Sequence, residues 1–240
     1  MSAAAPGMDW APLEVTLRLA ATTTAVLLAL GLPLGYWLAH TRSRARVVVD
    51  ALVALPLVLP PTVLGFYLLL AFGPAYAPGR ALAHWLGTSL AFSFPGLVVG
   101  SVVFSLPFMV LPVQSGLAAL PPSLREAAQT MGKREPSIAL HVLFPAAWPS
   151  ILAGVMLAFA HTVGEFGIVL MIGGNIPGST RVASIAIYDA VEGMRYGAAH
   201  AYAAVLVVLS FAVLLLVARL RRRTARPASS RVTAAAKVLP

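Results

Sequence analysis

Acids and histidines, the residue types that most often carry catalysis or bind metals, are few and scattered in this sequence. Its 240 residues include eight acids, five histidines and no cysteine. Only one acid, Glu165, falls deep inside a long apolar stretch, and His161 precedes it by four residues, on the same face of a predicted helix. Two such residues are too few for a metal site. We expect Glu165 to pair with a cation such as Arg18 or His161, or to serve as a gating or packing residue.

No segment has the residues needed for catalysis or for holding a nucleotide. The acids do not cluster with histidines or a nucleophile, so we predict neither an enzyme nor a bound cofactor or metal. The G-x-x-x-x-G-K-[ST] loop that cradles ATP phosphates does not occur in the sequence. Any ATP-driven activity would therefore need a separate ATPase chain.

The polar segment 121–145 has the clearest local pattern. Ser123 and Glu126 have the S-x-x-E spacing of a capping box, in which two side chains bond the first backbone N–H groups of a helix. Gly132 suits the left-handed conformation that ends a helix, and Pro136 suits the first turn of a second one. The segment therefore predicts two short helices joined by a tight turn.

Long apolar stretches must position these residues. Hydrophobic residues make up 59% of the chain and charged residues only 10%, against about 25% in a soluble domain. The pattern predicts an all-α integral membrane protein with about five transmembrane helices, at residues 13–40, 47–72, 95–117, 146–172 and 198–220. We expect these spans to form one transmembrane domain over residues 1–223, followed by a flexible cytoplasmic tail at 224–240.

Charge predicts the orientation of the spans. The loop after the first span carries three basic residues, the loop after the third carries three and the C-terminal region carries seven, which is 13 of the 17 in the chain. The positive-inside rule then places the N-terminus outside and the C-terminus in the cytoplasm. The net charge of +9 reflects this orientation, and we expect no binding to nucleic acid.

Prolines and hydroxyl groups occur inside the predicted spans. A proline lacks a backbone donor and bends a helix, so we expect interruptions in the second and third spans at Pro56, Pro60, Pro61, Pro107 and Pro112. The hydroxyls could line a hydrated path or simply join helices by hydrogen bonds, and we favour the second role for most of them: Thr22, Thr23, Thr24, Ser101, Ser105 and Thr162.

The polar segment also resembles the EAA loop of bacterial ABC import permeases. Its pattern is E-A-A-x-x-x-G, followed thirteen residues later by a proline that enters a span, and the matching residues are Glu126, Ala127, Ala128, Gly132 and Pro145. In that family the first short helix is the coupling helix, which fits a cleft on the ATPase subunit. The small alanines would permit close approach. The resemblance implies the permease fold of a type I ABC importer in the bacterial cytoplasmic membrane, surrounded by lipid. It also implies a homodimer of the permease with two ATP-binding subunits on the cytoplasmic side.

Three further segments resemble the molybdate permeases of this family. They are the stretch Leu55–Gly65, the sequence Gly164-Glu165-Phe166-Gly167, and the outer stretch Asn175–Arg181. The resemblance implies molybdate as the cargo. Permeases for tungstate and for sulfate or thiosulfate share parts of these motifs and stay open as alternatives, as does a passive channel, which would need no coupling loop.

The segment 173–196 lies on the outer side in this topology. We expect it to contain a short surface helix at about 182–192. By resemblance, this face would meet a periplasmic or extracellular oxyanion-binding protein, and an ordinary solvated loop is the alternative.

Overall fold

The computed structural model describes residues 9–87 and 89–224, and within these ranges every regular element is helical. Three helices are long and apolar enough to cross a membrane: α1 (Ala11–His40), α5 (Phe94–Ala118) and the apolar part of α12 (Tyr196–Thr224). They correspond to the first, third and fifth predicted spans. The predicted tail at 224–240 lies outside the described residues except for Thr224, the last residue of α12.

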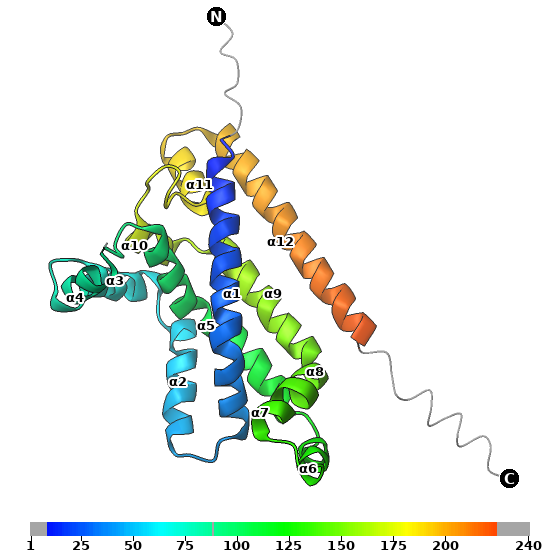
Figure 1. Ribbon diagram of the computed structural model, residues 1–240. Helices are drawn as coiled ribbons and strands as arrows, with labels where there is room; N and C mark the ends of the chain where they lie inside the picture. Colours follow the sequence, from blue (N-terminus) through cyan, green and yellow to red (C-terminus); the bar gives the residue numbers. More distant parts are fainter. Residues whose placement is uncertain (1–8, 88, 225–240) are drawn as a thin grey trace, which may run out of the picture.

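The centre of the bundle is the packing of α1 against α5. A Cβ atom added to Gly31 would lie 2.6 Å from Met109 Cγ, and one added to Gly35 would lie 2.7 Å from Val113 Cγ1. These two glycines are four residues apart on one face of α1, which lets the two helices approach closely. The helix α9 (Trp148–Gly164) packs against the same pair of helices. A Cβ atom added to Gly154 would lie 3.0 Å from the backbone oxygen of Met109. Figure 1 shows α1 in front of α5 and beside α9.

The second predicted span is broken. It consists of α2 (Ala45–Val58) and α3 (Pro61–Phe72), which meet at an angle of 112°. The break lies at Leu59 and Pro60, because Pro60 and Pro61 supply no backbone donors to continue the helix. The expected interruption at these prolines is therefore confirmed. Pro56, by contrast, lies inside α2.

The prolines of the third predicted span do not interrupt it. Pro107 and Pro112 both lie inside α5, which runs as one helix from Phe94 to Ala118. Buried neighbours hold this helix together, since eleven of its residues, including Pro107, are buried.

The fourth predicted span, 146–172, is also broken, at a point that the sequence did not indicate. The helix α9 ends at Gly164, and α10 (Gly167–Gly173) begins after Glu165 and Phe166. Before α9, the chain bends by 78° between Glu135–Ala146 and Trp148–Gly164. The described residues therefore contain three clear spans, or up to five if each bent pair counts as one.

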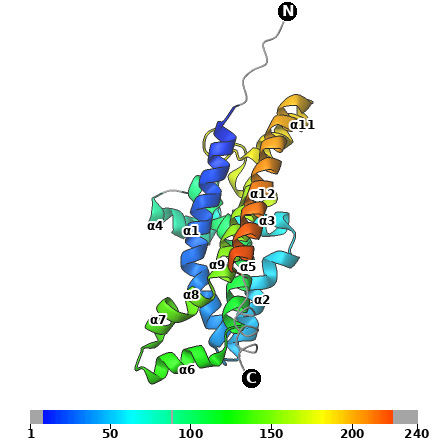
Figure 2. The same ribbon diagram turned by 90° about the vertical axis from the view of Figure 1, so that its right-hand side faces the viewer.

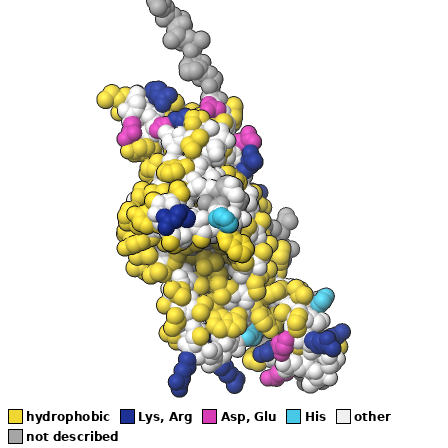
Figure 3. Space-filling view, turned by 60° about the vertical axis from the view of Figure 1, so that its left-hand side comes forward, with side chains coloured by type: hydrophobic (Ala, Val, Ile, Leu, Met, Phe, Trp, Pro, Cys, Tyr) yellow, Lys and Arg dark blue, Asp and Glu magenta, His cyan; other side chains and the backbone are white. Residues whose placement is uncertain are grey.

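The two ends of the bundle carry the polar segments. The helices α6 (Pro122–Thr130) and α7 (Glu135–Ile138) project from one end, and α11 (Ala183–Glu192) lies at the other (Figure 1; Figure 2). We call these the loop end and the opposite end. In Figure 3, hydrophobic side chains cover much of the middle of the molecule, and most of the charged ones lie toward the ends. This is the distribution expected of a membrane protein.

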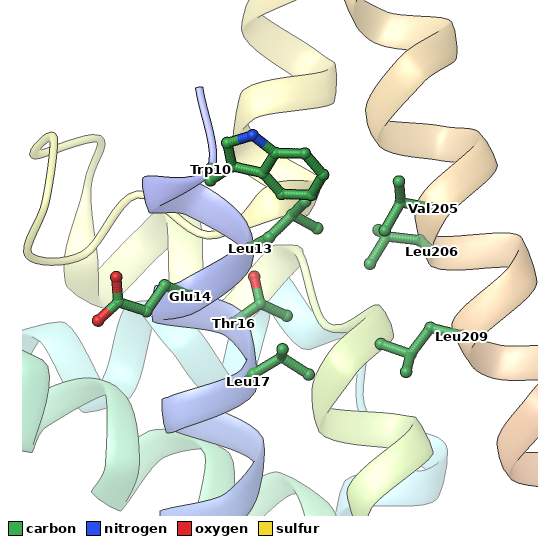
Figure 4. A pocket seen from close by; sticks show the side chains of 8 residues that line it. All are labelled: Trp10, Leu13, Glu14, Thr16, Leu17, Val205, Leu206 and Leu209. Atoms are coloured by element: carbon green, nitrogen blue, oxygen red, sulfur yellow. The ribbon is translucent and has the colours of Figure 1, made fainter. Parts of the chain in front are cut away.

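The last helix, α12, lies apart from the bundle over much of its length. In the most apolar 18-residue stretch of α12, only 11% of the residues are buried against the rest of the chain. Near the opposite end, a groove of about 350 Å³ separates it from α1, and Figure 4 shows Leu13, Leu17 and Leu209 lining the groove. The hydroxyl of Thr16 is already bonded to Pro12 O and to the N–H of Ala183, and Glu14 points away from α12 in Figure 4. The groove is therefore apolar and unsuited to an oxyanion.

Candidate functional site

The segment between α5 and α9 has the predicted helix–turn–helix form. The helix α6 ends at Thr130, and Gly132 follows with a φ angle of 72°, in the left-handed region. In the turn, the N–H of Gly132 donates to Gln129 O and that of Lys133 donates to Ala128 O. A Cβ atom on Gly132 would meet nothing within 4 Å, so glycine is needed there for its backbone conformation and not for space. Pro136 lies in the first turn of α7, as predicted.

The predicted capping box is wrong. The N-cap of α6 is Pro121, so Ser123 and Glu126 lie inside the helix, and no side chain caps its N-terminus. Pro122 occupies the first helical position, where its missing N–H removes one of the donors that would need a cap. The proline pair starts the helix two residues earlier than the capping box would.

The E-A-A residues point in different directions. Glu126 and Ala127 are exposed, whereas Ala128 is 6% exposed and packs with Leu117 and Leu143. The small side chain of Ala128 therefore lets α6 approach its own bundle. Of these three residues, only Glu126 and Ala127 are accessible to another chain.

Glu135 is the centre of a hydrogen-bond network that sequence reasoning missed. Its carboxylate accepts from Arg125 Nη2 at 2.9 Å, from Gln129 Nε2 at 2.9 Å and from the hydroxyl of Tyr36 at 3.0 Å. The hydrogen bond from Arg125 is the main reason that the pKa of Glu135 is lowered, and the one from Gln129 adds to it. No local pattern could have revealed this network, because Tyr36 is 99 residues away in the sequence.

Pro145 lies where the chain returns toward the bundle. A π-helical turn, Ala139–Leu143, precedes the short helix α8 (Phe144–Ala146), and Phe144 N–H donates to Ala139 O across the wider turn. Pro145 has no N–H to add to the helical ladder. The chain then bends at Ala147 and enters α9.

Glu165 lies at the break between α9 and α10 and is 5% exposed. Its carboxylate accepts a hydrogen bond from the N–H of Ile168 at 3.0 Å, so it caps α10. Its backbone oxygen accepts one from the hydroxyl of Ser184 at 2.6 Å. A backbone donor freed by the break therefore satisfies the buried carboxylate.

The predicted pairing of Glu165 with Arg18 or His161 is wrong. Arg18 lies 3.7 Å from Glu14 and over the ring of Phe94, and it is well exposed. His161 is bonded through Nδ1 to the hydroxyl of Ser105, 2.9 Å away. No group of three or more acids or histidines able to hold a metal occurs in the part of the chain that the structure describes.

The two broken spans meet beside Glu165. A Cβ atom on Gly167 would lie 2.7 Å from Pro61 Cβ, and one on Gly65 would lie 2.8 Å from Met171 Cβ. The ring of Phe166 lies 5.2 Å from that of Tyr188 on α11. Gly164 has open space around it. The first residues of α3 and α10 thus contact each other directly.

The predicted hydroxyl groups lie in three kinds of surroundings. Ser105 bonds Thr162 at 3.1 Å as well as His161, and so joins α5 to α9, as expected of hydroxyls that hold helices together. Three others are buried and make no hydrogen bond within the described residues: Thr23, Thr24 and Ser101. Thr22 is exposed.

The opposite end contains the predicted surface helix, as α11. Asp189 accepts hydrogen bonds from both Asn175 and Arg181 and ties the preceding loop to this helix. Burial alone would raise the pKa of Asp189, but the hydrogen bonds from Asn175 and Arg181 hold it below its usual value. Hydrogen bonds therefore hold the loop before α11 against this helix.

Comparison with known proteins gives consistent matches. Residues 31–226 match the family described as "binding-protein-dependent transport system inner membrane component". The chain is 48% identical over 215 residues to the molybdenum transport system permease protein ModB of Azotobacter vinelandii, covering 89% of this chain and 95% of that one. It is 32% identical to ModB of Escherichia coli strain K12, covering 80% and 85%. It is 35% identical to the sulfate transport system permease protein CysT of Salmonella typhimurium, covering 82% and 70%.

Solved structures share the fold. A chain of a bacterial ABC transporter involved in the import of the acidic polysaccharide alginate has a TM-score of 0.74 at 17% identity, covering 91% of this chain and 80% of that one. A chain of the inward-facing MetNI methionine ABC transporter has a TM-score of 0.68 at 21% identity, covering 88% and 94%.

Proposed function

Because the chain belongs to the family of binding-protein-dependent transport system inner membrane components, we propose that it is the membrane permease of an ATP-driven molybdate importer. It is a multi-pass inner membrane protein and a non-catalytic subunit, which depends on an ATPase and on a binding protein. The observation that supports molybdate as the cargo is the 48% identity to ModB of Azotobacter vinelandii over nearly the full length of both chains.

Molybdate is favoured over sulfate by the same comparisons. The sulfate permease of Salmonella typhimurium is 35% identical, and the chain covers only 70% of it, against 95% of the Azotobacter vinelandii protein. Uptake of labelled molybdate, tungstate and sulfate by proteoliposomes that hold the complete transporter tests this choice. Preferred uptake of sulfate would refute the proposal that molybdate is the cargo. Flux of molybdate through the permease alone, without ATP, would refute the importer and indicate a passive channel.

The proposed ATPase contact is the exposed face of α6. Glu126 and Ala127 lie on it, and the neighbouring side chains of Leu124 and Met131 are 38% and 74% exposed. Apolar side chains this exposed, outside the long apolar helices, are typical of a surface that another protein covers. Ala128, Gly132 and Pro145 take an indirect part, because they set the position and shape of the loop.

The proposed assembly has two copies of this chain, two ATPase subunits at the loop end and a binding protein at the opposite end. The sparse burial of α12 supports a second copy, since one chain encloses little space by itself. The arginines of the α1–α2 loop and of α6 support placing the loop end in the cytoplasm, with the N-terminus outside. In this assembly, the helices of each copy form a single permease domain, residues 1–223.

The proposed gate is the contact between α3 and α10. Both helices begin at breaks within the membrane, and backbone irregularity at that depth is tolerated where it is buried or lines a cavity. Gly167 and Gly65 allow the close contact, Glu165 caps α10, and Gly164 ends α9. Phe166 packs beside the contact, against Tyr188 of α11. In this proposal Glu165 shapes the gate and does not meet the cargo, which it would repel.

A further inference from the structure

We propose that Glu135 and Tyr36 link the ATPase-docking helix α6 to α1, so that a movement of α6 is passed directly to a membrane-spanning helix. Glu135 is then a positioning residue, which acts through Tyr36 and Arg125. This inference rests on the proposed function, because it assumes that an ATPase moves α6.

The link is a single carboxylate that joins three helices. Glu135 is the first residue of α7, Arg125 and Gln129 belong to α6, and Tyr36 belongs to α1. The Oε1 atom of Glu135 accepts from Arg125 and Gln129, and Oε2 accepts from Tyr36 and, at 3.3 Å, from Arg125 Nε. Hydrogen bonds to a charged group are stronger than neutral ones.

The helix α6 has few other attachments to the bundle. Ala128 is its only buried residue. The apolar contact of Ala128 presses α6 toward the bundle but does not fix its rotation or direct it toward a particular helix. Among the described residues, the side-chain hydrogen bonds from α6 to other elements all go to Glu135, so this residue orients α6.

Tyr36 is itself held in place. Its ring packs edge-on against the ring of Phe144, with ring centres 6.1 Å apart. It also lies against the ring of His40, with ring centres 4.5 Å apart. Phe144 directly precedes Pro145, where the chain returns to the membrane. The hydroxyl of Tyr36 is therefore presented to Glu135 from a packed ring.

The helix α1 is well suited to carry a movement across the membrane. It is unbroken over 30 residues, or about 45 Å at 1.5 Å per residue, whereas the second and fourth spans are broken. Near its other end, the hydroxyl of Thr16 accepts a hydrogen bond from the N–H of Ala183, the first residue of α11, at 2.8 Å. A displacement of Tyr36 along α1 would therefore reach the surface proposed for the binding protein without crossing a break.

Replacing Tyr36 by phenylalanine separates this role from mere support of the loop. The substitution removes the hydroxyl that reaches Glu135, but leaves the ring packing and the bonds of Glu135 to Arg125 and Gln129. The matched control is Tyr76→Phe, because Tyr76 is 50% exposed and its hydroxyl makes no hydrogen bond within the described residues.

The experiment compares proteoliposomes that contain the complete transporter with wild-type, Tyr36→Phe or Tyr76→Phe permease. ATP hydrolysis, molybdate uptake and the amount of ATPase that copurifies are measured together. We expect Tyr36→Phe to keep ATPase binding and hydrolysis but to lower the molybdate taken up per ATP by about three- to tenfold, the range for one exposed hydrogen bond to a charged group. Tyr76→Phe should match the wild type.

Two results would overturn the inference. One is an unchanged uptake per ATP in Tyr36→Phe. The other is a loss of copurifying ATPase, which would show that the hydroxyl only supports the structure of the loop. A wild-type transporter without ATP-driven molybdate uptake would instead refute the proposed function itself, so the two failures are distinguishable.

Discussion

The contact between the two broken spans gives the sharpest quantitative test. In Gly167→Ala, the new Cβ atom would lie 2.7 Å from Pro61 Cβ, whereas ordinary van der Waals contacts lie at 3.4–4 Å. Pro61 cannot rotate away, because its ring is fused to the backbone at the start of α3. The helices α3 and α10 must therefore separate by about 0.7–1.3 Å, which we expect to cost about 1–3 kcal/mol of stability.

The matched control lies three residues away in the same motif. A Cβ atom on Gly164 would meet nothing within 4 Å, and this glycine is the last residue of α9. Gly164→Ala should therefore be neutral or slightly stabilising.

The melting temperature of the purified permease and its molybdate uptake measure the difference. At about 2–4 °C per kcal/mol, Gly167→Ala should lower the melting temperature by about 2–12 °C, and uptake should fall with it. Equal effects of the two substitutions, or a larger effect of Gly164→Ala, would refute the proposed packing of α3 on α10.

Three further predictions concern the loop end. Glu126→Lys should abolish copurification of the ATPase while changing the free energy of unfolding by less than about 0.5 kcal/mol, because Glu126 is exposed; retained copurification would count against the docking face. Gly132→Ala should cost about 1–2 kcal/mol because φ is 72°, and Gly132→Asn should cost less; equal melting temperatures of the two variants would contradict this. The stabilisation of α6 by Glu135, whose pKa is lowered, should be present above the usual pKa of a glutamate and lost as the pH falls through the lowered value. Amide exchange in α6, corrected for intrinsic rates, should then show constant protection from about pH 8 to 5 and weaker protection below, and an unchanged profile would argue against the network.

Local rules predicted much of the loop. Gly132 and Pro136 lie where backbone preferences place them, because a left-handed residue and a first-turn proline depend on few neighbours. The capping box was wrong because a second local signal competed with it. Ser123 and Glu126 have the right spacing, but Pro121 and Pro122 start the helix two residues earlier. Where two local signals compete, spacing alone does not decide between them.

The errors at Glu165 have a different origin. A carboxylate inside a span suggested a cationic partner, since a continuous helix leaves no free backbone donor. The break after Gly164 frees such a donor, and Ile168 supplies it. The break lies where α10 contacts α3, and no sequence period reveals that contact. The Tyr36–Glu135 contact was equally out of reach, because it joins residues of two elements that only the fold brings together.

The sparse burial of α12 also bears on how the subunit is made. This helix leaves the ribosome after α1, α5 and α9, which can by then pack on one another through Gly31, Gly35 and Gly154. Since only 11% of its most apolar stretch is buried against the rest of the chain, α12 can enter the lipid as an independent helix and join the finished core afterwards. Insertion of α12 is therefore separable from folding of the core, and a nascent chain that ends before Tyr196 already holds α6, α7 and both broken spans.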